Sequence, residues 1–575
     1  MFGSYALTFG RGQHRHELRE RASAAGLVIV ESPALLFVAG AETAFLRSDS
    51  AILVGQCFPP GDEPLTAPPP VIGSCAAGLR AALDDHWGNF VLFCAGPDEW
   101  MAYREPSGTI AAYRCGSGDS AVFVSDAAIA RRLGLLAHAR PDLCFAVHWL
   151  QFPFLRTRRS GIEDVTELLP GMATTKAAAG SWTESVLWRP ADFIRRSETV
   201  RDPREAADQL RELALRVVAA QPGSSAALLQ LSGGLDSSII AACLAHAGKK
   251  VACINFATRS VDGDERQFAR DVAQAFDLPL TELIEAEPAA IEPDSLPSFR
   301  PRTNPLLAPL ERAVASAADE LNASLLIDGG GGDNLFCSIN SASPVLDAFC
   351  LGGIGAARMA VADIAMRAGC TWWDVIAAAG RRLFKRRPEW KEDRSFLDHA
   401  ALLARPELHP WLRGLRAAPP GKREHVEALV HIQHFLDRGS TDLPRLHPLM
   451  AQPLLELCLG IPSWLWMHGG RDRAIARDAF AGLVPQSVLA RRAKGSLQSL
   501  FHRSFEKLRP QIRDILMTGE LRRAGITDAA RLDAALSGDE WARDEVQLRI
   551  SELVALELWL QSWRSPACGC SASVP

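Results

Sequence analysis

Residues 228–240 read Leu228-Leu229-Gln230-Leu231-Ser232-Gly233-Gly234-Leu235-Asp236-Ser237-Ser238-Ile239-Ile240. The apolar run 226–231 is long enough for a buried strand, and residues 237–247 form an apolar helix that Gly248 ends. A tight glycine turn therefore lies between a strand and a helix N-terminus. Backbone N–H groups and the positive end of the helix dipole meet there, which suits a phosphate or a pyrophosphate.

The polar side chains of this loop fit the same ligand. The hydroxyls of Ser232, Ser237 and Ser238 add hydrogen-bond donors, and the carboxylate of Asp236 can hold a magnesium ion. The alternative is a plain turn in which Ser and Asp cap a helix, a common arrangement between strands and helices. For Ser-Gly-Gly-Leu-Asp-Ser-Ser in this position we favour nucleotide binding.

A second glycine loop follows another predicted strand, 324–328, and reads Asp328-Gly329-Gly330-Gly331-Gly332-Asp333-Asn334. Four glycines let the backbone approach a ligand closely. Because both loops follow strands of one sheet, Asp333 can face Asp236 across the strand ends. Two carboxylates beside a triphosphate suit octahedral magnesium. The chain has no Gly-x-x-x-x-Gly-Lys-Ser/Thr loop, so transfer of a γ-phosphoryl group by that route is unsupported.

The order of predicted elements divides the chain into two domains and a tail. Residues 1–195 contain short runs of alternating or apolar residues separated by turns, which predict a sandwich of antiparallel sheets. Residues 196–564 alternate strands and helices up to about 328, which predicts a doubly wound parallel sheet, and continue as a mainly helical part. Residues 565–575, which include Cys568 and Cys570, are predicted to be a tail.

Composition excludes several classes of function. At 575 residues the chain exceeds the ~250–300 residues of a single core, and its net charge of -5 gives no case for nucleic-acid binding. The 13 cysteines show no Cys-x-x-Cys pair, which predicts reduced thiols and a cytoplasmic location. We find no signal peptide and no long apolar run, and therefore expect no membrane span. The basic run 381–387 fits a solvated helix end or a docking patch for an acidic peptide or protein.

These motifs carry a resemblance to a known family. Residues 232–238 resemble the pyrophosphate loop of the asparagine synthetase family, ATP-pyrophosphatases that adenylate a carboxylate. Further segments follow in the family's order: Asp264-Glu265-Arg266, Asp333-Asn334-Leu335-Phe336, Pro448 to Pro462, and Arg491-Arg492-Ala493-Lys494-Gly495. The resemblance covers roughly residues 201–564.

The resemblance implies an ATP site with bound magnesium. It places these residues around the nucleotide: Leu231, Ser232, Gly233, Gly234, Asp236, Ser237, Ser238, Thr258, Asp328 and Gly329. It assigns magnesium to Asp236 and Asp333, and it puts Lys494 over the α-phosphate and the reacting carbonyl as the catalytic residue. Sequence reasoning alone finds no clear general base. Glu265 is a candidate, although an exposed acidic residue at a helix start explains it as well.

The N-terminal domain resembles the class II glutaminase domain of the same enzymes, with one departure. Those domains begin Met-Cys-Gly and use the cysteine as nucleophile, whereas this chain begins Met1-Phe2-Gly3. Phenylalanine carries no nucleophile, so glutamine cannot be attacked there. Cys57 is internal and lacks the free α-amine that would act as base. We expect a degenerate domain that releases no ammonia.

A second departure concerns the substrate. Related synthetases tend to have an acidic residue where this chain has Gly330, and the glycine is expected to open space in the pocket. An inactive glutaminase beside an adenylation site most resembles the lasso-peptide macrocyclases. Such an enzyme adenylates an Asp or Glu side chain of a precursor peptide and joins it to the peptide's N-terminal amine, giving AMP and pyrophosphate. The resemblance also implies a leader-peptide protease as a partner.

Two other functions stay open at this point. An ammonia-dependent asparagine synthetase or a β-lactam-type synthetase would share the ATP site and differ in the nucleophile. A non-catalytic ATP-binding scaffold would not need Asp236, Asp333 and Lys494 together.

Overall fold

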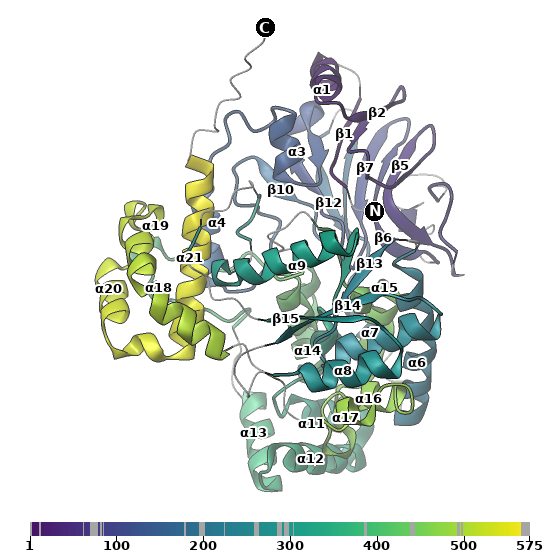
Figure 1. Ribbon diagram of the computed structural model, residues 1–575, viewed down its shortest axis with the longest axis vertical. Coiled ribbons are helices and arrows are strands. Elements are labelled where there is room, and N and C mark those ends of the chain that lie inside the picture. The colour runs from purple at the N-terminus through teal and green to yellow at the C-terminus, as the bar shows by residue number, and fades with distance from the viewer. Residues whose placement is uncertain are drawn as a thin grey trace.

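The fold is described from a computed structural model of the chain. It describes residues 3–10, 13–60, 63–69, 79–80, 83, 85–177, 180–194, 202–223, 225–257, 264–284, 290–292, 298–302, 304–384, 388–436, 443–491, 495 and 498–564. Figure 1 shows antiparallel sheets at one end of the molecule and the helices α12 and α13 at the other.

Two antiparallel sheets of six strands each form the N-terminal part. The first has the spatial order β10 (Val165–Glu167), β8 (Tyr113–Cys115), β9 (Val122–Val124), β1 (Tyr5–Phe9), β3 (Leu35–Ala39), β2 (Val28–Glu31). The second has the order β12 (Thr183–Val186), β11 (Met172–Ala177), β7 (Glu99–Arg104), β6 (Trp87–Ala95), β5 (Ala51–Phe58), β4 (Phe45–Arg47). Leu7 and Phe37 of the first sheet share one buried cluster with Val54 and Phe93 of the second. The predicted antiparallel sandwich is therefore confirmed.

Helices accompany these sheets. They are α1 (Gln13–Ala24), α3 (Ala127–Arg132), α4 (Leu143–Gln151) and α5 (Ala191–Ile194). The sequence predicts helices at 13–25, where α1 lies, and at 73–85, which falls mostly outside the described residues. The strands β4, β10, β11 and β12 were not predicted; β4, β10 and β12 have only three or four residues each, which gives little periodicity.

A parallel sheet of five strands organises the second part. Its spatial order is β15 (Leu280–Ile284), β14 (Ala252–Ala257), β13 (Ala227–Gln230), β16 (Leu325–Ile327), β17 (Arg445–Leu446). Leu229 packs into the cluster that contains α6 (Pro203–Ala220), α7 (Leu235–His246) and α8 (Arg266–Ala275). Its neighbour Leu228 packs on the other face against α9 (Ala308–Glu320). Helices thus cover both faces, as predicted for a doubly wound sheet.

The strand order reverses between β13 and β16. The chain runs outward from β13 through β14 to β15 and then returns to β16 on the other side of β13. Ligands of open parallel sheets bind in the crevice at such a switch point, at the carboxyl ends of the strands. Both glycine loops begin there, since one follows β13 and the other follows β16.

Helices make up most of the remaining chain. In order they are α10 (Gly332–Leu335), α11 (Ser343–Asp347), α12 (Gly353–Ala368), α13 (Trp372–Phe384), α14 (Pro420–Ile432), α15 (Gln452–Gly460), α16 (Ala474–Ala479), α17 (Gln486–Leu489), α18 (Gln498–Thr518), α19 (Glu520–Arg523), α20 (Ala529–Ser537) and α21 (Asp544–Arg564). The helices α18 to α21 share a buried cluster with β1, β9 and α4 of the N-terminal part. The end of the chain therefore packs back onto its beginning.

A buried ion cluster also joins the two parts. Glu167 of β10 is completely buried and pairs with Arg104 (Nη1–Oε1 2.8 Å), Arg300 (Nε–Oε2 3.1 Å) and Arg156. Burial opposes ionisation of Glu167, but the three guanidinium groups lower its pKa to about 2. Arg156 donates another hydrogen bond to the carbonyl oxygen of Gln433, at the end of α14 (2.6 Å).

One helical stretch of the described residues, 343–368, has the length and apolar composition of a membrane span. Its most apolar window is 33% buried inside the molecule. Core helices of soluble proteins have the same composition, so the stretch is weak evidence for a membrane span.

Candidate active site

A cavity of about 670 Å³ opens at the carboxyl ends of β13 and β16. Its lining comes from the loop and helix start after β13, from the glycine loop after β16, and from residues between 472 and 491. The volume lies within the range of small-molecule sites, ~300–1,000 Å³. The cavity therefore occupies the switch point of the sheet, where the sequence places its two motifs.

The loop after β13 is shaped by its own side chains. The N–H of Ser232 donates to Ser237 Oγ (3.2 Å), and the N–H of Gly234 donates to Ser232 Oγ (3.2 Å). The hydroxyl of Ser238 donates to the carbonyl oxygen of Gly234 (2.7 Å). Gly233 has φ +74°, and a Cβ there would lie 2.8 Å from the backbone nitrogen of Ala269. The loop thus requires glycine at 233 and is preformed.

The N-terminus of α7 points into the cavity. Gly234 is the N-cap and offers no side chain to the first turn, and Leu235, Asp236 and Ser237 line the cavity. The first N–H groups of a helix lack partners within the helix and carry partial positive charge. This end of α7 can therefore bind a phosphate group with the hydroxyls of Ser232 and Ser237 beside it.

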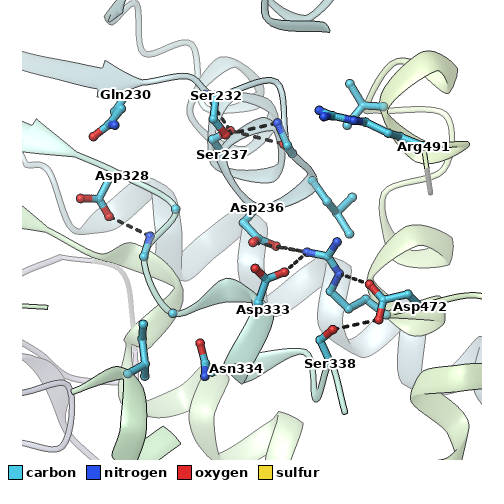
Figure 2. Close-up of a pocket in the computed structure, with 18 of the residues that line it drawn as sticks. Gln230, Ser232, Asp236, Ser237, Asp328, Asp333, Asn334, Ser338, Asp472 and Arg491 are labelled. Atoms are coloured by element: carbon cyan, nitrogen blue, oxygen red, sulfur yellow. Dashed lines mark hydrogen bonds and ion pairs between the residues drawn. The ribbon is translucent and has the colours of Figure 1, made fainter. Parts of the chain in front are cut away.

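The two predicted magnesium ligands come together. Figure 2 shows the side chains of Asp236 and Asp333 next to each other on one wall of the cavity. A Cβ at Gly332 would lie 2.4 Å from Cγ of Asp236, so only glycine allows the second loop this close to the carboxylate. The run of glycines after β16 is explained in part by this approach.

An arginine that sequence reasoning missed lies between these carboxylates. Nη1 of Arg473 is 3.1 Å from Asp236 Oδ1 and also bonds Asp333, and its Nε donates to Asp472 (2.8 Å). Arg473 has φ 52°, which is a left-handed conformation. Such a conformation costs a non-glycine residue roughly 1–2 kcal/mol. Burial opposes the charge of Arg473, but the carboxylates of Asp236, Asp333 and Asp472 raise its pKa. The only local signal was the run Arg471-Asp472-Arg473.

The position of Arg473 tests whether the site suits magnesium. Two carboxylates converge on one cationic group, so their oxygens face a common place for a cation. Within the described part of the chain no group of three or more His, Cys, Asp or Glu side chains could hold a metal by itself. Magnesium commonly takes one or two protein carboxylates and completes its shell with phosphate oxygens and water. Asp236 and Asp333 fit this pattern once Arg473 releases them.

A buried ion pair supports the second loop from behind. Asp328 accepts a hydrogen bond from the N–H of Gly330 (2.7 Å) and pairs with Nδ1 of His447 (2.7 Å). Nε2 of His447 donates to the carbonyl oxygen of Leu436 (2.6 Å). Burial opposes both charges, but the pairing lowers the pKa of Asp328 and raises that of His447.

His447 also corrects the interpretation of Gly330. A Cβ at Gly330 would lie 2.7 Å from Nδ1 of His447 and 3.2 Å from a methyl group of Leu436. The glycine therefore opens no space in the pocket, because the imidazole already occupies the place of the missing side chain. The expected enlargement of the substrate site at this residue was wrong.

Glu265 is neither exposed nor placed as a free base. Its side chain is 13% exposed, pairs with Arg491 and accepts the N–H of Gly495 (2.6 Å). Arg491 in turn lies over the ring of Phe268 (4.4 Å) and donates to the carbonyl oxygen of Gly233 (3.3 Å). Glu265 thus contacts both Arg491 and Gly495, and Arg491 links it to the loop after β13.

Comparison with known proteins identifies the second part of the chain. Residues 202–437 and 441–561, more than half of the chain, match the family model described as asparagine synthase. The chain belongs to the asparagine synthase family. Enzymes of this family use ATP, usually with magnesium, and the chain is an ATP-dependent carbon–nitrogen ligase.

The other comparisons add little. No curated protein matches the chain. Two solved structures with low similarity are an allosteric regulatory enzyme of purine biosynthesis (10% identity, 57% of this chain, 89% of that chain, TM-score 0.22) and a glutamine PRPP amidotransferase from B. subtilis in complex with ADP and GMP (9% identity, 57% and 90% coverage, TM-score 0.22).

The remaining site residues of this asparagine synthase-family chain divide into three groups. Ser232, Gly234, Asp236, Ser237, Asp328, Gly329 and Asp333 line the cavity, together with the unpredicted Gln230, Ser338, Asp472 and Arg477. Leu231, Gly233 and Ser238 are not among the residues that line the cavity; Leu231 and Ser238 are buried, and the carbonyl oxygen of Leu231 accepts from the side chain of Asn255 (2.8 Å). Thr258 and Lys494 fall outside the described residues, so their roles stay predictions.

Proposed function

We propose that the chain is an ATP-dependent macrocyclase of lasso-peptide type. It adenylates an Asp or Glu side chain of a precursor peptide and releases pyrophosphate. The N-terminal amine of the same peptide then attacks the activated carbonyl, which forms an isopeptide bond and releases AMP. A leader-peptide protease is the proposed partner that exposes this amine.

The activation step is supported by the cavity at the switch point. The loop 231–234 and the N-terminus of α7 provide donors for the pyrophosphate, and Asp236 and Asp333 would hold magnesium. Magnesium bound there would offset the charge that builds up on the phosphate oxygens. Arg473 can donate to those oxygens after it leaves the carboxylates, because a guanidinium binds phosphate as well as carboxylate.

The observation that carries the choice of nucleophile is Phe2. A phenylalanine stands where the glutaminase motif has its cysteine, so the chain has no thiol to release ammonia from glutamine at that position. Cys57 cannot substitute: it is completely buried, and burial raises the pKa of its thiol to about 12. This departure from the motif favours an amine from another source, and the peptide's own N-terminus is the proposed one.

Ring closure needs positioning more than additional functional groups. Holding amine against carbonyl in one geometry can supply ~7–11 kcal/mol of the barrier. Water must be excluded as well, because it would hydrolyse the acyl-adenylate. The hydrogen bonds within the loop after β13 and the Asp328–His447 pair beside the loop after β16 fix two walls of the cavity, which supports the positioning of the reactants.

The test combines the purified protein with magnesium, ATP and the precursor peptide encoded beside its gene. We expect pyrophosphate release and a peptide product that has lost one water, detected by mass spectrometry. Asp236→Asn should lower the rate at least ~100-fold while the circular dichroism spectrum stays unchanged, because the cavity loses one magnesium ligand. Phe2→Ala should cyclise at the wild-type rate.

Different outcomes would separate the rival functions. Formation of asparagine from aspartate and ammonia, with no reaction of the peptide, would identify an ammonia-dependent synthetase. Turnover of a small β-amino acid would identify a β-lactam-type synthetase. Absence of pyrophosphate release with any of these acceptors would contradict an adenylating enzyme.

A further inference from the structure

Exposed large hydrophobic side chains of the described residues concentrate on α12, on α13 and on the turn that precedes α12. Eight of the fourteen exposed large hydrophobic side chains lie between residues 349 and 383. They are Phe349, Ile354, Met359, Met366, Trp372, Trp373, Ile376 and Leu383, and we call them the apolar corner. Scattered exposed hydrophobic residues are ordinary, but a concentration on neighbouring elements marks an interaction surface.

The positions of these residues follow from helix geometry. On α13 the side chains of Trp372, Trp373, Ile376 and Leu383 fall within an arc of about 100°, because successive residues are offset by about 100°. An adjoining face of the same helix buries Val375 and Ala379. On α12, Met359 and Met366 share a face by helical spacing, whereas the small residues at 360, 361 and 365 are buried. The inward faces belong to the core, whereas the side chains of the apolar corner are largely exposed.

The two helices meet at one end of the molecule. Figure 1 shows α12 along the lower edge and α13 beside it, at the end opposite the antiparallel sheets. Thr371 starts α13: its hydroxyl accepts the N–H of Asp374 (3.2 Å), and Asp374 accepts the N–H of Thr371 (3.0 Å). This reciprocal capping fixes the two tryptophans at the turn between the helices. Trp373 is 78% exposed there.

The charge of this region differs in sign from that of the whole chain. Residues 349–384 contain four arginines (358, 367, 381 and 382) and two aspartates (363 and 374), a net charge of +2, whereas the chain carries -5. Asp374 is engaged at the helix start, and Asp363 is half-buried. Arg358 and Arg381 are exposed. The next three residues in the sequence, 385–387, are also basic and lie outside the described residues.

We propose that the apolar corner docks on the surface of an anionic lipid bilayer. Tryptophan prefers the interface between water and acyl chains, and arginine beside it attracts anionic headgroups. A second copy of the chain fits less well, because its corner carries the same positive charge. The helical stretch 343–368 does not cross the bilayer, because residues 343–348 are buried in the protein and α12, which makes up most of the rest, contains Arg358, Asp363 and Arg367. A membrane span needs about 20 predominantly apolar residues.

This proposal adds to the sequence analysis, which expected no membrane partner and interpreted the basic run as a solvated helix end or as a docking patch for an acidic peptide or protein. The sequence contains no long uncharged apolar run and therefore predicted no membrane-spanning helix. Which apolar side chains of a helix remain exposed depends on tertiary packing, so the sequence could not predict the apolar corner. The proposal is independent of the proposed function.

Docking at the corner would place the active site close to the bilayer. Arg367, in the last turn of α12, pairs with Asp472 (3.2 Å), which holds Arg473 in the cavity. A Cβ at Gly470 would lie 2.6 Å from the sulfur of Met366, so α12 packs directly against the segment that precedes Asp472. Substrate or product that partitions into the bilayer would reach the cavity over a short path.

Flotation of the full-length protein with lipid vesicles tests the proposal. Vesicles contain phosphatidylcholine alone, or phosphatidylcholine and phosphatidylglycerol in equal parts. We expect binding to the mixed vesicles, a loss of at least ~10-fold for the double variant Trp372→Ser and Trp373→Ser, and weaker binding at high salt. Arg381→Glu should weaken binding to the mixed vesicles only. Leu548→Ser, at an exposed apolar position of α21, is the matched control and should bind like the wild type.

Three results would overturn the proposal. One is the absence of flotation, and another is an equal loss of binding in Leu548→Ser. The third is a wild-type protein that does not bind vesicles but forms a soluble dimer, or a soluble complex with an acidic peptide, and loses this association in the double tryptophan variant. Because both tryptophans are exposed, their replacement should leave the thermal unfolding temperature unchanged, which separates lost docking from lost folding.

Discussion

Arg473 is the residue on which the state of the active site depends. Its guanidinium lies between Asp236 and Asp333 and neutralises two carboxylates that would otherwise repel each other. Magnesium needs the same oxygens. The arginine therefore stabilises the site before the substrate binds and must give up the carboxylates when the metal arrives. Asp472 pairs with Nε of Arg473, so the arginine keeps one ion pair when it leaves Asp236 and Asp333.

Replacing this arginine should make the site depend on magnesium. In Arg473→Met the two carboxylates face each other without a cation, so the protein should unfold at a lower temperature. Magnesium without nucleotide should then raise the unfolding temperature by ~2–4 °C more in the variant than in the wild type. Differential scanning fluorimetry measures this, with sodium sulfate at equal ionic strength as the control. Equal magnesium shifts in both proteins would argue against a shared cation position.

At the scale of elements, the two loops after β13 and β16 could be predicted from the sequence. The residues from other segments that contact these loops could not. Strand, glycine turn and helix follow one another in sequence, so Asp236 and Asp333 were assigned from local pattern and parallel-sheet geometry. Arg473 and His447 enter from elements that are distant in sequence from the loop or helix start that they contact. Gly330 is the clearest example of what the sequence could not predict. His447 fills the space beside this glycine, and no local sequence pattern connects the two residues.

The loop after β16 should depend on pH through His447. The raised pKa of His447 means that its charge stabilises the fold fully below its ordinary value of 6.5, and that this contribution is lost as the pH rises through the raised value. The pKa of Asp328 is lowered, so the sign is reversed. The charge of Asp328 stabilises the fold fully above pH 3.8, and this contribution is lost as the pH falls through the lowered value.

The variant His447→Gln keeps a donor toward Leu436 but carries no charge. We expect it to unfold at a lower temperature than the wild type at about pH 6, with a difference that shrinks toward about pH 9. Thermal unfolding across this range provides the measurement. His502→Gln is the control, since the side chain of His502 is 39% exposed. Ion pairs of exposed groups contribute little, so this control should show a much smaller effect. A difference that does not change with pH would mean that shape alone, without charge, supports the loop.

At the scale of the whole molecule, the N-terminal sandwich supports the ligase part whether or not it has a reaction of its own. Phe58, Trp87 and Trp188 of the N-terminal part belong to the same buried cluster as the parallel sheet and its helices. The sandwich is therefore part of the structural support of the parallel sheet. The ion cluster at Glu167 connects the sandwich to the cavity wall. Arg156 links the cluster to Gln433, which is the neighbour of Ile432 in that wall.

Glu167→Gln tests this coupling. The variant leaves three arginines buried around a neutral side chain, and breaking a buried ion cluster in this way costs ~3–5 kcal/mol. The wild-type advantage should be complete above pH 4.5 and decline as the pH falls through about 2, because the pKa of Glu167 is lowered in the fold. Urea unfolding at neutral pH should begin at a lower concentration, and pyrophosphate release should fall with it as the wall at Ile432 loosens.

The matched control for this variant is Glu184→Gln, which removes a partly exposed carboxylate that lies 3.7 Å from Arg158. Because exposed ion pairs are weak, this change should alter the free energy of unfolding by less than ~1 kcal/mol. Pyrophosphate release should then stay at the wild-type rate. If Glu167→Gln unfolded the sandwich and left ATP turnover intact, the two parts would be energetically independent despite their shared core.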